Sequence, residues 1–395
     1  MKKYIYHLSA VILIVVFSVG CTTDLLKPTE NDGTPPGPIS DVQIENLSGS
    51  VVLSYTLPDD PDVFYAKAVY NTERNVVREA KASYYTNEMT LTGFGNNKPY
   101  EVQLYAVDRG ENVSKPITVT VNPEKAPYQN VSESLNIGPD FGGIFVDFEN
   151  PTEDNLAIVV LANDSLGNFI PYNTYYTQKI EGRFSTRGFE SVETDFGVYI
   201  RDRWGNISDT TMVSLTPYFE TEIDKSEITD LTLPNDAILG YGGNIPALFN
   251  DDITEGGGFY SSGDQARMPQ WFSFDLGKKV KLSRLTWWMR SDGTRWLYSL
   301  HNPRNIEIYG SNDPAPDGSW ESWDLIIEYE QIKPSGLPNG QLSNDDLAAA
   351  EAGETIVFPL NTKGYRYIRF KTLRNWSNGT YVNFNEISLW GQPVD

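Results

Sequence analysis

The sequence has almost none of the residues that cross-link chains or build histidine metal sites. Its 395 residues include one cysteine and two histidines. A single cysteine excludes intrachain disulfides, so the domains must be stabilised by their own hydrophobic cores. The histidines are His7 and His301, so a histidine-rich metal site is excluded as well.

Catalytic motifs are also scarce. His7 lies in the N-terminal apolar segment, which leaves His301 as the histidine for any Ser-His-Asp triad, and no nucleophile-elbow motif accompanies it. The 53 acidic residues leave open a carboxylate pair for glycoside hydrolysis. Small β-sandwiches rarely host such a pair, and no long catalytic domain remains in the chain. We therefore expect a protein without enzymatic activity.

Positive charge is scarce too. The formal net charge is −22, and removal of residues 1–20, which contain two lysines and no acid, would take it to −24. Such an acidic chain is a poor partner for nucleic acid or for anionic lipid surfaces. The acidic residues are not in blocks, so the charge indicates solubility outside the cell.

The first residues predict export and lipidation. Two lysines precede an apolar run, Val11–Val19, which is shorter than the ~20 residues of a membrane-spanning helix. The run ends in Ser18-Val19-Gly20-Cys21, which resembles the lipobox of bacterial lipoproteins, although leucine is more common where Ser18 stands. The resemblance implies a signal peptide over 1–20 and a lipid on Cys21. A plain secretory signal with an incidental cysteine is the alternative.

Residues 21–38 are polar and rich in Pro and Gly, which predicts a flexible tether to the first domain. The acidic residues after Cys21 resemble the surface-export signal of Bacteroidota lipoproteins. We therefore expect a chain that is anchored in the outer membrane and displayed at the cell surface.

Beyond the tether, apolar and polar residues alternate between turn clusters, which is typical of half-buried strands. Two such faces are formed by Val51, Leu53 and Tyr55, and by Tyr100, Val102, Leu104 and Ala106. The stretch MTLTGFGNNKPYEVQLYAVDRGENVS, 89–114, resembles the second half of a fibronectin type III domain, with Tyr100 as its corner tyrosine. We predict an Ig/fibronectin III-like sandwich over 39–123.

An internal repeat predicts a second sandwich of the same type over 124–220. Gly49–Pro58 corresponds to Gly142–Pro151 with an offset of 93 residues, and Asp108–Ser114 corresponds to Asp202–Ser208 with an offset of 94. The two offsets differ by one residue, as expected for one loop insertion. We interpret both sandwiches as spacers.

The C-terminal part, 232–395, differs in composition, because eight of the nine tryptophans lie between Trp271 and Trp390. Its segments resemble, in order, the discoidin or coagulation factor 5/8 type C family of galactose-binding-like sandwiches: LFNDDIT (248–254), PQWFSFDLG (269–277), NPRNIEIYGSND (302–313), GYRYIRFK (364–371) and NEISLWG (385–391). The resemblance implies a jelly-roll β-sandwich. The whole chain is thus predicted to be all-β, with two Ig/fibronectin III-like sandwiches followed by a discoidin-like jelly roll.

A calcium site is the first of two predicted sites. Oxygen-bearing side chains crowd the loop LFNDDIT, which suits a hard cation. In the discoidin family this loop and a glutamate near the C-terminus hold a structural calcium. By that resemblance the ligands here would be Asn250, Asp252, Thr254 and Glu386. The alternative is an ordinary turn rich in Asn and Asp.

A carbohydrate site is the second. Sugars are bound by aromatic faces together with planar polar groups, and two polar loops offer both. The candidate ligand-binding residues are Arg295, Trp296, Tyr298, His301, Arg374, Asn375, Trp376 and Asn378. Trp271, Trp287 and Trp390 lie in strand patterns and are expected in the core.

The arrangement of tether, two spacers and distal head resembles lipoproteins of Bacteroidota polysaccharide-utilisation systems. It implies binding of a polysaccharide or oligosaccharide, next to an outer-membrane transporter complex. Two alternatives stay open: a protein-interaction or scaffold lipoprotein of an outer-membrane complex, and an accessory to an enzyme encoded nearby.

Overall fold

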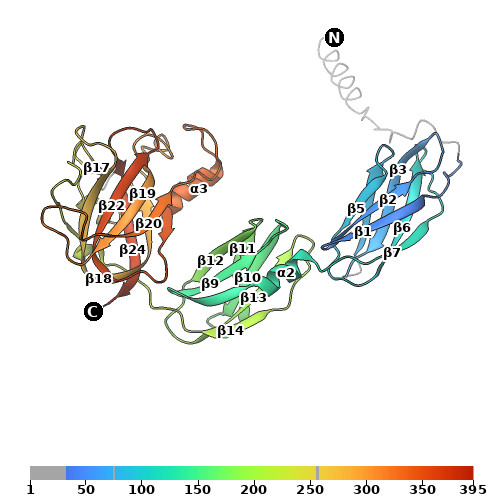
Figure 1. The fold of residues 1–395 in the computed structure, drawn as a ribbon, viewed down its shortest axis with the longest axis horizontal. Coiled ribbons are helices and arrows are strands. Elements are labelled where there is room, and N and C mark those ends of the chain that lie inside the picture. Colours follow the sequence, from blue (N-terminus) through green and yellow to red (C-terminus); the bar gives the residue numbers. More distant parts are fainter. Residues whose placement is uncertain (1–32, 74–75, 255–257, 395) are drawn as a thin grey trace, which may run out of the picture.

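The computed structural model describes residues 33–73, 76–254 and 258–394. The described chain is all-β and forms three sandwiches that follow one another in chain order (Figure 1). The predicted fold class is therefore confirmed. The predicted signal peptide, Cys21 and the first part of the tether lie outside the described residues.

The first sandwich packs a three-stranded sheet, β1-β2-β5, on a four-stranded sheet, β4-β3-β6-β7. Its strands are β1 (Ser40–Leu47), β2 (Ser50–Thr56), β3 (Val63–Asn71), β4 (Val77–Ser83), β5 (Glu88–Thr92), β6 (Tyr100–Asp108) and β7 (Ile117–Val121). The predicted inward face of β2 is confirmed, since Val51, Leu53 and Tyr55 are at most 4% exposed. On β6, the Tyr100 hydroxyl donates to the Asn96 side chain at 2.9 Å and holds the preceding loop on the sandwich.

The second sandwich repeats this topology, with sheets β8-β9-β12 and β11-β10-β13-β14. Its strands are β8 (Asn136–Asp140), β9 (Gly143–Glu149), β10 (Leu156–Asn163), β11 (Phe169–Thr177), β12 (Glu181–Arg187), β13 (Thr194–Asp202) and β14 (Thr211–Leu215). Strand β9 begins 93 residues after β2, and β13 begins 94 residues after β6. The offsets in the sequence therefore report equivalent strands.

The repeated Asp, Asn and Ser residues form the same turn in both sandwiches. In the first, the Asp108 carboxylate accepts from the Asn112 backbone and side chain, at 2.8 and 2.9 Å. In the second, the Asp202 carboxylate accepts from the Asn206 backbone and side chain, both at 2.8 Å. These residues are thus explained by turn chemistry.

The first two sandwiches meet through a short helix and a tryptophan. Helix α2 (Pro127–Ser134) follows the connection, and its Tyr128 hydroxyl donates to the Gly95 carbonyl at 2.7 Å. Trp204, which lies outside the tryptophan-rich part of the sequence, stacks under the Arg78 guanidinium of the first sandwich at 4.3 Å. Trp204 therefore belongs to the joint between the sandwiches.

The C-terminal sandwich is organised around one long strand. The principal sheet has the order β15-β24-β18-β22-β19-β20, with β16 and β21 also paired to β18, and β17 pairs with β23. Its strands are β15 (Thr221–Glu222), β16 (Thr229–Asp230), β17 (Tyr260–Ser261), β18 (Gln270–Trp288), β19 (Pro303–Ser311), β20 (Asp324–Glu330), β21 (Glu354–Val357), β22 (Tyr365–Asn375), β23 (Asn383–Phe384) and β24 (Glu386–Pro393). The pairing register of β18 shifts between Asp275 and Val280, so its first half pairs mainly with β22 and its second half with β24.

The core of this sandwich is aromatic, with stacked rings of Phe272, Phe370 and Phe384. Trp287 is completely buried, as predicted. Trp271 and Trp390 are only half-buried, because each lies on the outer face of the sheet beside an arginine. The prediction that these two tryptophans lie in the core was wrong. A two-residue period shows which residues share one face of a strand, but it does not show which face points to the interior.

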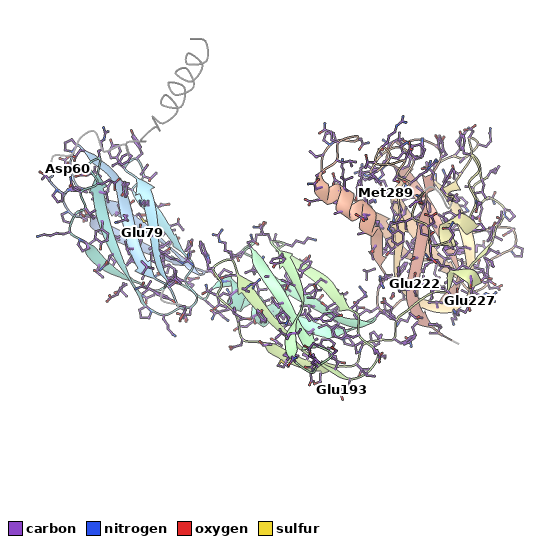
Figure 2. All side chains as sticks on the ribbon, turned by 180° about the vertical axis from the view of Figure 1, so that it is seen from behind. Asp60, Glu79, Glu193, Glu222, Glu227 and Met289 are labelled. Atoms are coloured by element: carbon purple, nitrogen blue, oxygen red, sulfur yellow. The ribbon has the colours of Figure 1, made fainter. Side chains whose placement is uncertain are left out.

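The short strand β15 ties the second sandwich to the C-terminal one, because it pairs with β24. Glu220, just before it, accepts from the Ser283 hydroxyl and from the Arg284 guanidinium at 3.3 Å. Figure 2 shows Glu222 where the connection reaches the C-terminal sandwich, and Met289 farther along that sandwich, just after β18. The connection is therefore part of the last sheet.

Three further helical segments complete the described fold. They are α3 (Asn344–Ala352), which lies between β20 and β21, and the 3-10 turns η1 (Lys225–Glu227) and η2 (Pro246–Phe249). None of the described helices has the length and apolar character needed to cross a membrane.

Candidate functional site

The two predicted ligand loops lie against each other after β18 and β22. The Leu300 carbonyl accepts from the Ser377 N–H at 2.8 Å, and the His301 carbonyl accepts from the Asn383 N–H at 3.1 Å. The fully buried Asn302 side chain holds the first loop closed, because its amide donates to the Trp296 carbonyl at 2.8 Å. Residues far apart in the sequence thus form one loop cluster.

An aromatic stack crosses this cluster. The His301 ring lies on the Tyr381 ring with centroids 3.7 Å apart and planes 28° apart. The Tyr381 ring in turn contacts the Tyr241 ring at 5.4 Å, and Tyr241 is 56% exposed. The stack therefore runs from a half-buried histidine to an exposed tyrosine, and its outer end is an aromatic surface open to solvent.

Polar groups flank the stack on both sides. The Tyr241 hydroxyl bonds the Asp264 carboxylate, and the exposed Arg267 guanidinium is held by the Asp264 and Ala266 carbonyls, at 3.1 and 2.7 Å. On the other side, burial and the nearby Arg290 guanidinium lower the pKa of His301, so its ring is neutral at pH 7. Donors and acceptors therefore surround an apolar aromatic surface, the composition typical of small-ligand sites.

The Arg290 guanidinium itself lies between two rings. Its centre is 3.8 Å from the Phe259 ring and 4.1 Å from the Trp296 ring. Trp296 is half-buried, and Arg295 beside it is exposed. Among the described residues, the Arg295 guanidinium makes no hydrogen bond or ion pair, so this arginine is available to a ligand.

The remaining predicted residues play supporting parts in the described structure. Tyr298 and Trp376 are 1% and 7% exposed and pack edge to face beneath the loops. The buried Asn375 side chain caps the following turn by accepting from the Gly379 N–H at 2.8 Å. The Arg374 guanidinium donates instead to the side chains of Asn305 and Glu330, which are outside the loop cluster. Asn378 is exposed at the tip of the turn with a φ of +57°.

The sequence prediction missed Tyr241 and Tyr381. Tyr241 lies in a Gly-Tyr-Gly-Gly turn, in which a side chain at Gly243 would come within 2.3 Å of the Ser261 nitrogen. Close approach of two backbones requires glycine there, and the tyrosine between the glycines is pushed outward at a φ of +51°. A lone aromatic residue among glycines was the available signal.

Unfavourable backbone conformations gather in these loops. Of ten described non-glycine residues with positive φ, five lie here: Tyr241, Asp292, Tyr298, Leu300 and Asn378. Bulky residues such as tyrosine and leucine rarely adopt this conformation, and residues that do so cluster at binding sites.

The predicted calcium loop lies at a separate place, where it contacts the start of β24. The Asn250 side chain accepts from the Asp252 N–H at 2.9 Å, and the Asp252 carboxylate accepts from the Thr254 N–H at 2.8 Å. Glu386 is fully buried, and its carboxylate accepts from the Asn250 N–H at 3.3 Å and from the Lys225 ammonium at 2.8 Å. Burial raises the pKa of Glu386 to about 7, and the ion pair with Lys225 opposes that rise.

These contacts test whether the residues suit calcium. Lys225 also binds Asp251, which was not among the predicted ligands, at 2.6 Å. An ammonium group therefore lies where the buried carboxylate would meet a metal ion. No group of three or more His, Cys, Asp or Glu in the described ranges could hold a metal. Calcium binding by Asn250, Asp252, Thr254 and Glu386 stays a prediction, and the contacts of Lys225 weigh against it.

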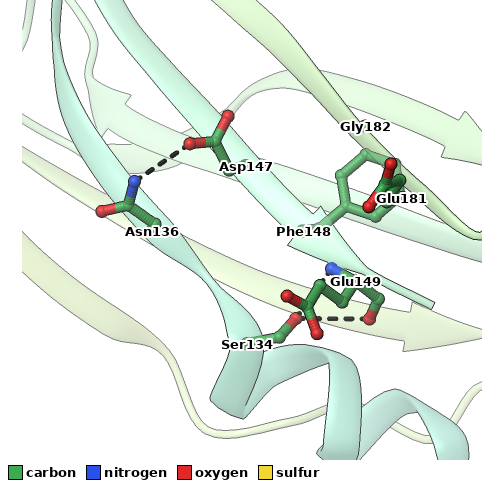
Figure 3. Close-up of a pocket in the computed structure, with 7 residues that line it drawn as sticks. All are labelled: Ser134, Asn136, Asp147, Phe148, Glu149, Glu181 and Gly182. Carbon is green, nitrogen blue, oxygen red and sulfur yellow. Dashed lines mark hydrogen bonds between the residues drawn. The ribbon is translucent and has the colours of Figure 1, made fainter. Parts of the chain in front are cut away.

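A further hollow of about 460 Å³ lies on the second sandwich, between β8, β9 and β12 (Figure 3). Its Asp147 carboxylate is bonded by Asn136 at 2.9 Å and by Arg183 at 2.7 Å. The hydrogen bond from Arg183 holds the pKa of Asp147 below its usual value. A carboxylate so stabilised in its ionised form is unsuited to act as a general acid.

Comparison with known proteins supplies the family. Three families described only as domains of unknown function match in succession: DUF4959 over residues 36–123, DUF5126 over 124–226 and DUF5000 over 249–391. A solved SusE-like protein, BT2857, shares 32% sequence identity over 68% of this chain and 100% of its own, with a TM-score of 0.46. The chain belongs to the SusE-like family.

The sequence identity over the full SusE-like chain carries this assignment. Other similar structures cover only a part. A putative chitobiase fragment from Bacteroides thetaiotaomicron is 17% identical over 44% of this chain and 95% of its own, with a TM-score of 0.32. A structure described as GH31 CBM32-2 bound to GalNAc is 13% identical over 41% of this chain and 95% of its own, with a TM-score of 0.28. No curated protein matches the sequence.

Proposed function

We propose that this SusE-like protein is a non-enzymatic cell-surface lipoprotein that binds carbohydrate through the loop cluster of its C-terminal sandwich. The observation that carries the proposal is the stack of His301, Tyr381 and Tyr241, which ends in the exposed ring of Tyr241. Asp264, which the Tyr241 hydroxyl bonds, also holds the exposed Arg267 guanidinium through its backbone carbonyl. The C–H face of a sugar ring packs on such a surface, and guanidinium donors bond its hydroxyls.

The setting proposed for this activity follows from the family and from the N-terminus. A lipid on Cys21 would anchor the chain in the outer membrane, and the two fibronectin III-like sandwiches would hold the head away from the bilayer. The glycan, a polysaccharide or oligosaccharide, would be passed to an outer-membrane transporter complex of a polysaccharide-uptake system.

Glycan-array and affinity-electrophoresis measurements test the binding activity. The chain that begins at residue 21, with Cys21→Ser to prevent lipidation, should retain at least one glycan. Tyr241→Ala and Tyr381→Ala should each weaken binding by about tenfold or more, the equivalent of about 1.4 kcal/mol. Tyr85→Ala, which removes an 87% exposed tyrosine from the first sandwich, is the matched control and should bind normally.

Two results would count against the proposal. Unchanged affinity in folded Tyr241→Ala and Tyr381→Ala variants would show that the glycan does not bind at the loop cluster. Failure of the parent chain to bind any glycan on the array or in the gels would exclude the proposed carbohydrate binding.

A scaffold role in an outer-membrane complex is the second candidate. Strand β11 lies at the edge of its sheet and exposes Phe169, Ile170, Tyr172 and Tyr176, each at least 37%. Exposed apolar side chains on an edge strand favour contact with another chain. Cross-linking in intact membranes that captures a partner through β11, without retained glycan, would favour this role.

A further inference from the structure

The buried carboxylate at the start of β24 needs a positive partner. Glu386 is completely buried, and an isolated ionised carboxylate in such a place is strongly disfavoured. The resemblance to discoidin-type sandwiches implies that this partner is a calcium ion. Among the described residues, the Lys225 ammonium supplies a positive charge 2.8 Å from the Glu386 carboxylate.

Lys225 is well placed to act as a permanent cation. It lies in η1, directly after the connection that joins the second sandwich to the C-terminal sheet. The connection itself is secured, because the Ile223 N–H donates to the Leu389 carbonyl at 2.8 Å and the Ile223 side chain is 1% exposed. The lysine side chain is only 10% exposed, so the surrounding residues hold its ammonium group in one position.

The same ammonium bridges two acidic residues. It lies 2.6 Å from the Asp251 carboxylate, and Asp251, which lies in the predicted calcium loop just after η2, adopts a φ of +64°. The loop is also tied directly to the residue before β24, since the Asn385 side chain donates to the Ile253 carbonyl at 3.0 Å. One lysine therefore joins the connection, the loop and the last strand, which is the role of a structural metal.

A calcium ion and this lysine exclude each other. Calcium requires six to eight oxygen ligands at about 2.3–2.6 Å. An ammonium group already bonded to Glu386 and Asp251 repels a divalent ion at the same oxygens and occupies part of the space that its ligands need.

We propose that Lys225 is the resident cation of this sandwich and takes the structural place that calcium holds in related sandwiches. The C-terminal domain then folds and functions without calcium, and removal of the lysine side chain creates a calcium-responsive protein. A hollow lined by Lys225, Asn250 and Asp251 opens this place to solvent, so an ion could enter once the ammonium is gone.

Thermal melting with and without calcium tests the proposal on the chain that begins at residue 21 and carries Cys21→Ser. The parent chain should melt at the same temperature in chelator and in millimolar calcium. Lys225→Met should melt several degrees lower in chelator and recover in calcium, with one ion bound by calorimetry. Lys278→Met is the matched control: it removes a neighbouring exposed lysine paired with Glu227, and it should show no response to calcium.

Three outcomes overturn the proposal. The first is calcium found by mass spectrometry in the purified parent chain, with a melting temperature that falls on chelation; this holds even if Lys225→Met fails to fold. The second is a folded Lys225→Met variant that binds no calcium. The third is a Lys225→Met/Glu386→Gln double variant that still binds it. Since none of these measurements involves a glycan, they stand apart from the proposed carbohydrate binding.

Discussion

The imidazole of His301 and the phenol ring of Tyr381 stack in van der Waals contact, 3.7 Å between centroids and 28° between planes. His301 lies two residues before β19 and Tyr381 lies between β22 and β23, so the contact joins two loops that the sequence separates. It also keeps the histidine half-buried next to Arg290. The electrostatics and the packing of the loop cluster can therefore be measured at this one ring.

The first prediction concerns the titration of His301. Burial and Arg290 both lower its pKa, so the value should lie below the ordinary 6.5. The folded-state pKa is depressed, so His301 contributes stability above pH 6.5 that is lost as the pH falls through its folded pKa. In a chain that begins at residue 21, His301 is the sole histidine, and its C2 proton resonance can be followed by NMR without assignment.

Arg290→Gln tests whether the Arg290 charge lowers the pKa of His301, and it should move the titration midpoint of His301 towards 6.5. Arg267→Gln removes a charge that is bonded to backbone carbonyls elsewhere in the cluster and should leave the midpoint in place. Equal shifts in both variants would show that overall charge, and not the position of Arg290, sets the pKa.

The second prediction separates the two loop tryptophans. Trp376 is 7% exposed, and its indole N–H donates to the Gln331 side chain at 2.8 Å. Trp376→Phe leaves the buried Gln331 oxygen without that donor and should lower the free energy of unfolding of the C-terminal sandwich by about 1–3 kcal/mol. Urea denaturation followed by tryptophan fluorescence and circular dichroism measures the loss.

Trp296→Phe is the control, because the Trp296 indole N–H has no hydrogen-bond partner among the described residues. It should cost clearly less stability than Trp376→Phe. Equal losses would mean that ring volume, and not the bond to Gln331, decides the effect at Trp376.

The third prediction uses the internal repeat as its own control. The Ser114 hydroxyl accepts from the Ala106 N–H at 3.0 Å, and the Ser208 hydroxyl accepts from the Ile200 N–H at 2.9 Å. Ser114 is 5% exposed, whereas Ser208 is half-buried. Ser114→Ala should therefore cost about 1–3 kcal/mol, and Ser208→Ala less, since water can reach the freed N–H group.

Hydrogen exchange read by mass spectrometry over β6 and β13 measures each sandwich separately. Faster exchange confined to the sandwich that carries the substitution, and larger for Ser114→Ala, is the expected result. Equal acceleration in both would show that burial does not separate the two serines.

Much of the fold follows from local patterns. A two-residue period predicts the inward faces of β2 and β6, because successive side chains of a strand point to opposite sides. The repeat offsets predict the second sandwich, because equal turns and strands need equal spacing. The two-residue period did not predict the burial of Trp271 and Trp390 correctly. The alternation is the same for both faces of a strand, and only the layer packed on the sheet shows which face is buried.

The candidate site was harder to predict from the sequence than the fold. The sequence predicted both loops and His301, because tryptophan, arginine and histidine stand out in polar stretches. It could not show that Tyr298 and Trp376 are turned inward, or that Tyr241 and Tyr381 meet, because these are properties of loops folded against one another.

By itself the sequence determined the all-β class, the repeated sandwiches and the tryptophan-rich last domain, because these depend on residue period and turn chemistry. Only the tertiary structure decided which rings face solvent and which cation faces Glu386. Lys225 and Glu386 lie 161 residues apart in the chain, and no local pattern connects them. Their contact exists because β15 adds the connection to the edge of the last sheet and carries the lysine to the buried carboxylate.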